Sequence, residues 1–165
     1  MDGIVLQPGM IQAVGGVLPN DWVTSTPTVS TQNNFSGWVG CRLEVGASDI
    51  NITHLGRWIV SGNTDIHEIA IWDAAGTQKL ASANIDTTEH SAGTFGFATC
   101  SYTLLANTQY RIGSKEVSGG DFWHSRQFYS TSAAASLVAP VFGVSNMTSQ
   151  AGNNPEIFGP VNFRY

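Results

Sequence analysis

Residues 38–45 read WVGCRLEV, the clearest pattern in this chain of 165 residues. Cys41 and Leu43 alternate with Arg42 and Glu44, so the apolar side chains fall on one face of an extended segment and the charged ones on the other. Strict alternation of this kind predicts a half-buried antiparallel strand. The sequence therefore predicts a body built from β-sheets.

Further along the chain, other segments also show strand character, and turns rich in Gly, Asn and Asp separate them. The expected strands cover residues 51–60, 67–72, 79–86, 95–105, 110–117 and 159–165. Residues 133–144 also help to close the domain, although residues 133–139 lack strand or turn character. No stretch has the period of a long amphipathic helix. Eight or so short strands at this spacing predict an all-β, antiparallel two-sheet β-sandwich, of jelly-roll or Ig-like type.

The beginning of the chain differs in composition from the rest. It holds the pair Gly15-Gly16 and the polar tract TSTPTVSTQNN that starts at Thr24. We predict an extended N-terminal arm over residues 1–36 and a β-sandwich domain over residues 37–165. The arm is too apolar for a plain flexible linker, so we expect it to pack against another chain or back onto the sandwich.

Charge and composition exclude several classes of partner. The net charge is −5, from 12 acidic and 7 basic residues, and no basic stripe for nucleic acid is present. No apolar run approaches the ~20 residues of a membrane span. The N-terminal segment lacks the basic start of a secretory signal peptide, so we expect either that the chain stays inside the producing cell or that it has lost its export signal. Only 12% of residues are charged, which suits packing against copies of the same chain or against neutral ligands such as sugars.

Several motifs together resemble a known kind of module. They are GWVG at 37–40, LGRW at 55–58, a His-containing strand after a Gly-Asn turn, Glu116 followed by GGD at 119–121 and Trp123, and GPVNFRY at 159–165. This series resembles a β-sandwich module appended to bacterial secreted and surface proteins, many of them glycan-active. The resemblance covers about residues 37–165 and implies a carbohydrate-binding or adhesion domain.

The best candidate ligand site lies within nine residues of sequence. Trp123 offers a face for stacking on a sugar, and Asp121 and Glu116 offer acceptors for hydroxyl groups. Trp72 is a further aromatic candidate, because it points away from the isoleucines of its strand. Two alternatives stay open: Trp123 is a buried loop anchor, or Asp121 caps backbone N–H groups as Asx turns do.

The sequence predicts no cofactor and no catalytic group. A calcium ion held by Asp121 and Glu116 is the one cofactor left open as an alternative. The histidines have no metal-ligand spacing, so no metal site is expected; they are His54, His67, His90 and His124. No catalytic constellation is apparent, and we expect a protein that is not an enzyme. Cys41 and Cys100 are either buried free thiols or one disulfide between the sheets.

Three functions are weighed. The first is a structural or attachment protein on a virion surface, such as a capsid decoration or cement protein or a head fibre, with itself and neighbouring capsid-type subunits as partners. For this function we expect a homo-oligomer, with a trimer as the specific expectation. The second is an extracellular carbohydrate-binding module of a secreted glycan-active enzyme or adhesin. The third is a spacer domain without a ligand.

Overall fold

The computed structural model describes residues 20–165, and these residues form strands and loops. The longer strands are β2 (Gly37–Val45), β3 (Ile50–Trp58), β4 (Ile66–Trp72), β5 (Lys79–Asp86), β6 (Phe95–Leu104), β7 (Gln109–Glu116), β10 (Ala135–Gly143) and β13 (Val161–Arg164). The short ones are β1 (Thr31–Gln32), β8 (Trp123–His124), β9 (Gln127–Phe128), β11 (Ser149–Gln150) and β12 (Glu156–Ile157), and η1 (Thr87–Glu89) is a single 3-10 turn. Within residues 20–165 no helix is long enough to cross a membrane.

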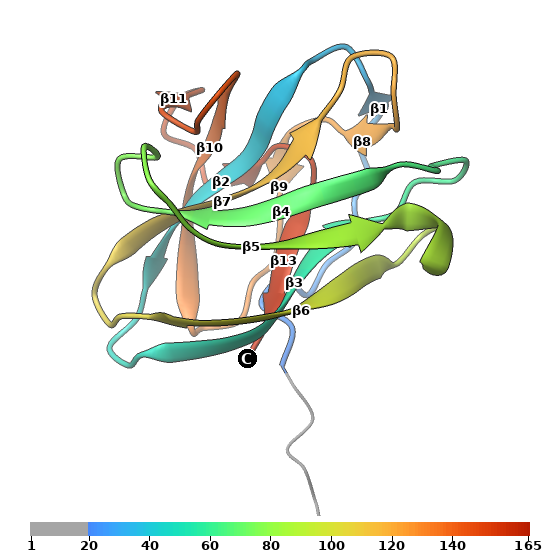
Figure 1. Cartoon of the computed structure of the whole chain (residues 1–165). Helices are drawn as coiled ribbons and strands as arrows, with labels where there is room; N and C mark the ends of the chain where they lie inside the picture. Colours follow the sequence, from blue (N-terminus) through green and yellow to red (C-terminus); the bar gives the residue numbers. More distant parts are fainter. Residues whose placement is uncertain (1–19) are drawn as a thin grey trace, which may run out of the picture.

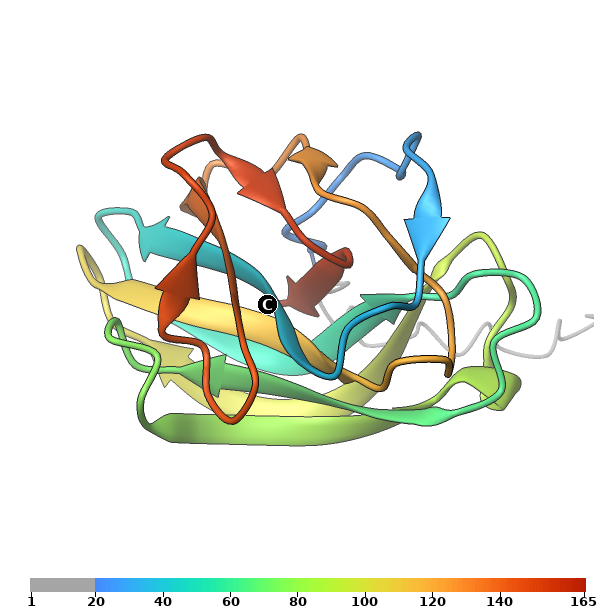
Figure 2. The same ribbon diagram turned by 90° about the horizontal axis from the view of Figure 1, so that it is seen from above.

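The strands form two larger sheets and two small ones. Six strands make up the largest sheet, in the order β11-β10-β2-β7-β4-β5, and a second sheet has the order β13-β3-β6. Figure 1 shows β2, β7, β4 and β5 side by side, with β13, β3 and β6 below them. The short strands pair as β1-β8 and β12-β9, and β1, β9 and β12 lie on the upper side of the view in Figure 2. Every pairing is antiparallel, so the predicted all-β chain with antiparallel sheets is confirmed.

The strand that opened the sequence analysis lies inside the largest sheet, between β10 and β7. Cys41 and Leu43 are buried and Glu44 is exposed, as the alternation predicts. A Cβ atom at Gly40 would collide with the carbonyl oxygen of Ile112, so β2 and β7 pack this closely only with glycine at that position. The pattern therefore predicted both the strand and the face that it buries.

One apolar core is shared by the two larger sheets. Ile69 and Ile71 of β4 and Ile112 of β7 enter it from the largest sheet, and Leu55 of β3 and Phe163 of β13 enter it from the other. Each of these side chains is at most 1% exposed. Burial of one such side chain stabilises the fold by roughly 1.5–3 kcal/mol. The core therefore holds the two sheets against each other.

A second apolar cluster covers part of the opposite face of the largest sheet. It consists of Trp38, Ala70, Trp72, Val141 and Met147. The rings of Trp38 and Trp72 meet edge to face with centroids 5.1 Å apart. Met147 comes from the loop between β10 and β11 and covers this face. Trp72 does point away from the isoleucines of β4, and this loop leaves it only 4% exposed.

Part of the predicted arm belongs to the packed body. Trp22 is fully buried and stacks on Phe163, with ring centroids 5.0 Å apart. Its Nε1 donates a hydrogen bond to the carbonyl oxygen of Ala135 at 2.9 Å. Trp22 and Val23 of the predicted arm therefore belong to the same core as the sheets. Residues 1–19 of the predicted arm lie outside the described residues.

The two cysteines are free thiols, which was one of the two alternatives left open. Cys41 and Cys100 are both buried and unlinked. Burial raises the pKa of both thiols above the ordinary value. Both therefore remain neutral at ordinary pH and pack as small apolar side chains.

Candidate functional site

The predicted ligand residues Glu116, Asp121, Trp123 and Trp72 are all buried, with exposed fractions of 1%, 7%, 4% and 4%. Trp72 lies in the second apolar cluster described above. The other three lie on two sides of the loop that joins β7 to β8: Glu116 and Asp121 on one side, and Trp123 on the other. None of the four presents a broad face to solvent, so their contact with a ligand stays a prediction.

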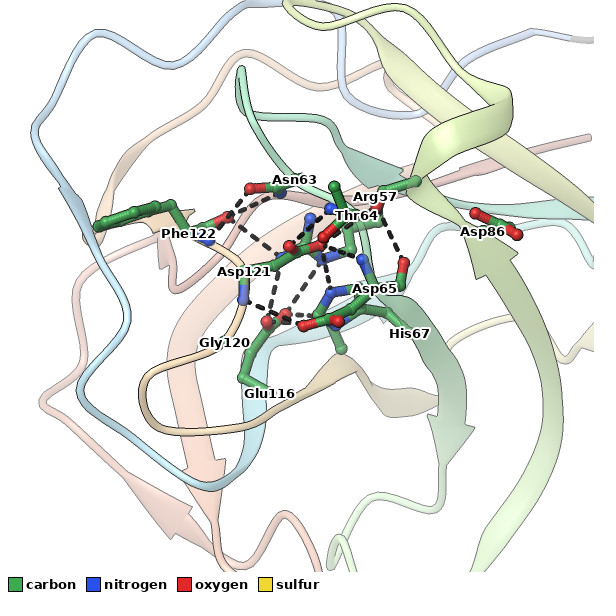
Figure 3. Close-up of polar contacts among 12 residues, drawn as sticks. Arg57, Asn63, Thr64, Asp65, His67, Asp86, Glu116, Gly120, Asp121 and Phe122 are labelled. Atoms are coloured by element: carbon green, nitrogen blue, oxygen red, sulfur yellow. Dashed lines mark hydrogen bonds and ion pairs between the residues drawn. The ribbon is translucent and has the colours of Figure 1, made fainter.

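A buried ion pair joins the two larger sheets. Arg57 of β3 donates from Nε and Nη2 to the two carboxylate oxygens of Glu116, the last residue of β7, at 3.1 and 3.0 Å. The hydroxyl of Ser114 donates to the same carboxylate at 2.6 Å. Removing one partner would leave an uncompensated buried charge, which typically costs about 3–5 kcal/mol. Together with His67 and Asp121, this pair forms what we call the polar cluster (Figure 3).

The imidazole ring of His67 lies between the two carboxylates of the polar cluster. Its Nδ1 is 2.9 Å from the carbonyl oxygen of Lys115 and 3.3 Å from Oε2 of Glu116. Its Nε2 is 3.1 Å from Oδ2 of Asp121. The two carboxylates considered for calcium therefore contact different nitrogens of one ring, and that of Glu116 is already bound by Arg57.

Asp121 fastens the loop between β3 and β4. Its Oδ1 accepts the N–H of Thr64 at 2.7 Å, and its Oδ2 accepts the N–H of Asp65 at 3.0 Å. Burial acts to raise the pKa of Asp121, but these backbone bonds and the contacts with His67 and Thr87 outweigh it and hold that pKa below its ordinary value. Asp121 thus plays the capping role that was left open as an alternative.

The next residue, Phe122, continues the attachment through its backbone. Its N–H donates to Oδ1 of Asn63 and its carbonyl accepts from Nδ2 of the same side chain, both at 3.0 Å. Arg57 donates to the same carbonyl at 3.2 Å. The ring of Phe122 points away from the cluster in Figure 3 and is 44% exposed. The loop is therefore held from beneath, and its charged groups serve this attachment.

An apolar hollow of about 300 Å³ lies on the other side of the loop, against Trp123. It is lined by Phe35, Val39, Trp123, Phe142 and Phe158, with Gln32 and Asn34 as its polar residues. Successive rings meet edge to face, with centroids 6.1 Å apart for Phe35 and Phe142, 6.0 Å for Phe142 and Phe158, and 6.4 Å for Phe158 and Trp123. Its volume is at the small end of the range for ligand pockets.

The sequence analysis did not identify the residues that complete the apolar hollow and the polar cluster. The hollow needs Phe35, Phe142 and Phe158, which come from three distant segments, and no local pattern marks them as neighbours. The polar cluster needs Arg57 and His67. An arginine inside the apolar motif LGRW was the available signal, because a charge in such a strand calls for a buried partner.

No protein-family model matches this chain, and no curated protein matches its sequence. The resemblance to bacterial surface modules therefore remains a prediction that rests on the motifs quoted above.

Proposed function

We propose that this chain is a structural and attachment protein without enzymatic activity, placed on a virion surface as a capsid decoration or cement protein or a head fibre. The observation that carries this proposal is the apolar hollow with its aromatic walls. A concave site lined by apolar and aromatic side chains is the usual form of a binding site, and this supports a partner at the hollow. A neighbouring capsid-type subunit would insert one hydrophobic side chain there.

The chemistry of the hollow favours a protein segment over a sugar. Its walls are apolar, and amide groups come only from Gln32 and Asn34. A sugar ring needs several hydrogen-bond partners around its edge, whereas an aromatic or aliphatic side chain needs only apolar contact. Binding of a hydrophobic anchor therefore uses most of the lining.

The polar cluster supports the same function by making the hollow rigid. It fixes Asp121 and the backbone of Phe122, and the next residue along the chain is Trp123 in the wall of the hollow. A binding surface built on a fixed loop loses less conformational entropy when its partner binds. This suits permanent attachment.

The proposal extends to the type of fold and the assembly. We take the two facing sheets as a β-sandwich of jelly-roll type, because most neighbours in the largest sheet are not consecutive along the chain. We further propose a homo-oligomer, a trimer in the assembled state, because a sheet-built body with 12% charged residues favours closed symmetric association.

Co-purification with particles tests the function. Particles isolated on a density gradient from cells that naturally produce the chain should contain it in stoichiometric amount, as measured by mass spectrometry. The variant Phe35→Ser should be lost from the particles, while the control Phe128→Ser should be retained, because Phe128 is 61% exposed and lies outside the hollow. A chain found only free of particles would contradict the proposal.

A carbohydrate-binding module is the second candidate, and one observation favours it. Gln32 and Asn34 stand beside aromatic walls, and amide groups next to an aromatic face are a common setting for a sugar ring. In this case the chain would act outside the cell, as part of a secreted enzyme or adhesin. Glycan-array binding that is lost in Gln32→Ala and Asn34→Ala, with no particle association, would favour this candidate over attachment.

A further inference from the structure

The apolar surface of the hollow continues beyond its walls. Gly37, the first residue of β2, lies against both Phe35 and Val144, because a Cβ atom there would be 3.0 Å from Cε1 of Phe35 and 2.8 Å from Cα of Val144. The side chain of Val144 is 72% exposed. The described residues that line the hollow carry no charge. The hollow and its rim therefore suit a partner that is apolar and uncharged.

A segment of matching chemistry occurs in the sequence outside the described residues. Residues 4–11 read IVLQPGMI, and Asp2 carries the one charged side chain of residues 1–19. The apolar side chains of Ile4, Val5 and Leu6 suit the walls of the hollow. The backbone of a peptide suits the two amide side chains of the lining, because an amide both donates and accepts hydrogen bonds.

The described chain begins at a point that is fixed to the body. The N–H of Asn20 donates to the carbonyl oxygen of Tyr165 at 3.0 Å, and the N–H of Tyr165 donates back at 3.2 Å. The N–H of Trp22 donates to the carbonyl oxygen of Phe163 at 2.9 Å, and its side chain is fully buried. Residues 20–22 therefore run antiparallel to β13, and Asn20 lies beside the last residue of the chain.

The hollow lies at the other end of β13. Phe158 of its wall precedes this strand, and Tyr165 follows it. Figure 1 shows β1 and β8, which contribute Gln32 and Trp123 to the lining, at the top of the view and the C-terminus at the bottom. The backbone from Trp22 back to Asn20 runs toward Tyr165 and so points away from the hollow of its own chain. This direction favours a neighbouring molecule as the one that receives the segment.

We propose that the hollow of one chain binds residues 4–6 of a second copy of this chain. The inference rests on the proposed function, and it names the neighbouring subunit that fills the hollow. Residues 6–20, fully extended, span about 46 Å, which is enough to reach an adjacent molecule. The contact is head-to-tail, because the segment and the hollow are different surfaces. Contacts of this kind close into a ring when a rotation relates the subunits, and a threefold rotation gives a trimer.

The first test measures self-association of the purified full chain, without an N-terminal tag and without particles, by light scattering. The wild type should form an oligomer at micromolar concentration. Leu6→Asp puts a charge into the segment and Phe35→Ser removes a wall of the hollow, so each should weaken self-association at least about tenfold. Gln12→Asp adds the same charge at a position that is already polar and should leave self-association unchanged.

A mixture of the two defective variants tests the direction of the contact. Leu6→Asp keeps an intact hollow, and Phe35→Ser keeps an intact segment. One head-to-tail contact can therefore form between them, and the mixture should contain pairs of chains and no closed ring. Two variants that stay separate when mixed would contradict a contact between segment and hollow.

Cysteine cross-linking identifies the contact even if Phe35→Ser folds poorly. A mixture of Leu6→Cys and Phe35→Cys chains should form a disulfide between the two different chains, detected by mass spectrometry. Leu6→Cys mixed with Phe128→Cys should not, because Phe128 is 61% exposed and lies outside the hollow. The native Cys41 and Cys100 are buried and do not compete.

The inference is overturned by a wild type that stays monomeric, by equal cross-linking to Phe35→Cys and Phe128→Cys, or by a disulfide that forms only within the double variant Leu6→Cys, Phe35→Cys. The last result would put the segment into the hollow of its own chain. Failure of the proposed function is read separately. Chains that cross-link but are absent from particles would support the contact and contradict the virion role, whereas particle-bound chains that do not cross-link would contradict the contact alone.

Discussion

The polar cluster and the apolar hollow are neighbours along the chain and opposites in chemistry. Asp121 and the backbone of Phe122 belong to the cluster, and Trp123, the next residue, belongs to the wall of the hollow. The cluster is closed and its charges are paired within it, whereas the hollow is open and apolar. One short loop therefore has an inner side that holds it in place and an outer side that borders an apolar hollow.

This difference shows why a compact sequence motif can combine two roles. Glu116, Asp121 and Trp123 fall within nine residues and suggest a single site, yet they contact different parts of the fold. The two carboxylates are occupied with keeping the loop in place, and the aromatic ring lines a surface. Mutations on the two sides should therefore fail in different ways.

The largest expected effect comes from breaking the ion pair of the cluster. In Glu116→Gln the guanidinium of Arg57 stays buried without its counter-charge. We expect the free energy of unfolding to fall by about 3–5 kcal/mol. Urea denaturation followed by tryptophan fluorescence measures this.

A paired replacement is the control for that loss. The double variant Arg57→Met, Glu116→Leu removes both charges and should recover a large part of the lost stability, because two apolar side chains need no counter-charge. Equal stability of the single and double variants would mean that the pair is not the source of the loss.

The second effect is Trp123→Ala, on the apolar side. Truncating a buried tryptophan leaves a cavity, and we expect a loss of about 3 kcal/mol, the lower end of the usual range because one side of the ring borders the hollow. Trp123→Phe should lose less than half of this. A Trp123→Ala variant that melts like the wild type would show that the ring contributes little to packing.

The long strands could be predicted from the sequence because their periodicity is local. Residues 79–86 match β5 at both ends, and residues 38–45 match β2 except for Gly37. The strands β8, β9, β11 and β12 have two residues each and are too short to show any alternation. Trp22, embedded near a polar tract, had no local pattern to mark it as part of the core.

The sequence drew attention to the residues of the predicted site but not to their surroundings, and their contact with a ligand stays a prediction. Sequence proximity singled out Asp121 and Trp123 but could not show which segments pack on each side of the loop. Arg57 reaches it from β3, and Phe35 and Phe158 reach it from segments more than a hundred residues apart. The pairing of strands and the packing of sheets bring these residues to the loop. Both depend on contacts between distant segments, which a local motif does not contain.

The third effect separates binding from stability. Phe35 is half-buried and lines the hollow, so Phe35→Ala should cost about 1 kcal/mol of stability while abolishing attachment of the partner. Thermal unfolding and association with particles are measured on the same preparation. A variant that attaches normally would show that the hollow is not the attachment surface.

The smallest effect concerns an exposed counterpart of the buried pair. Lys79 and Glu68 form an ion pair at 2.5 Å between β5 and β4, with side chains 38% and 25% exposed. Water screens such a pair, so Glu68→Gln should cost about 0.5 kcal/mol or less, and the difference from the wild type should shrink further in 1 M salt. Glu116→Gln in the same salt should keep nearly all of its loss, because solvent ions do not reach a carboxylate that is 1% exposed. If both variants respond equally to salt, the cluster is open to water, and the contrast between a closed inner side and an open outer side of the loop fails.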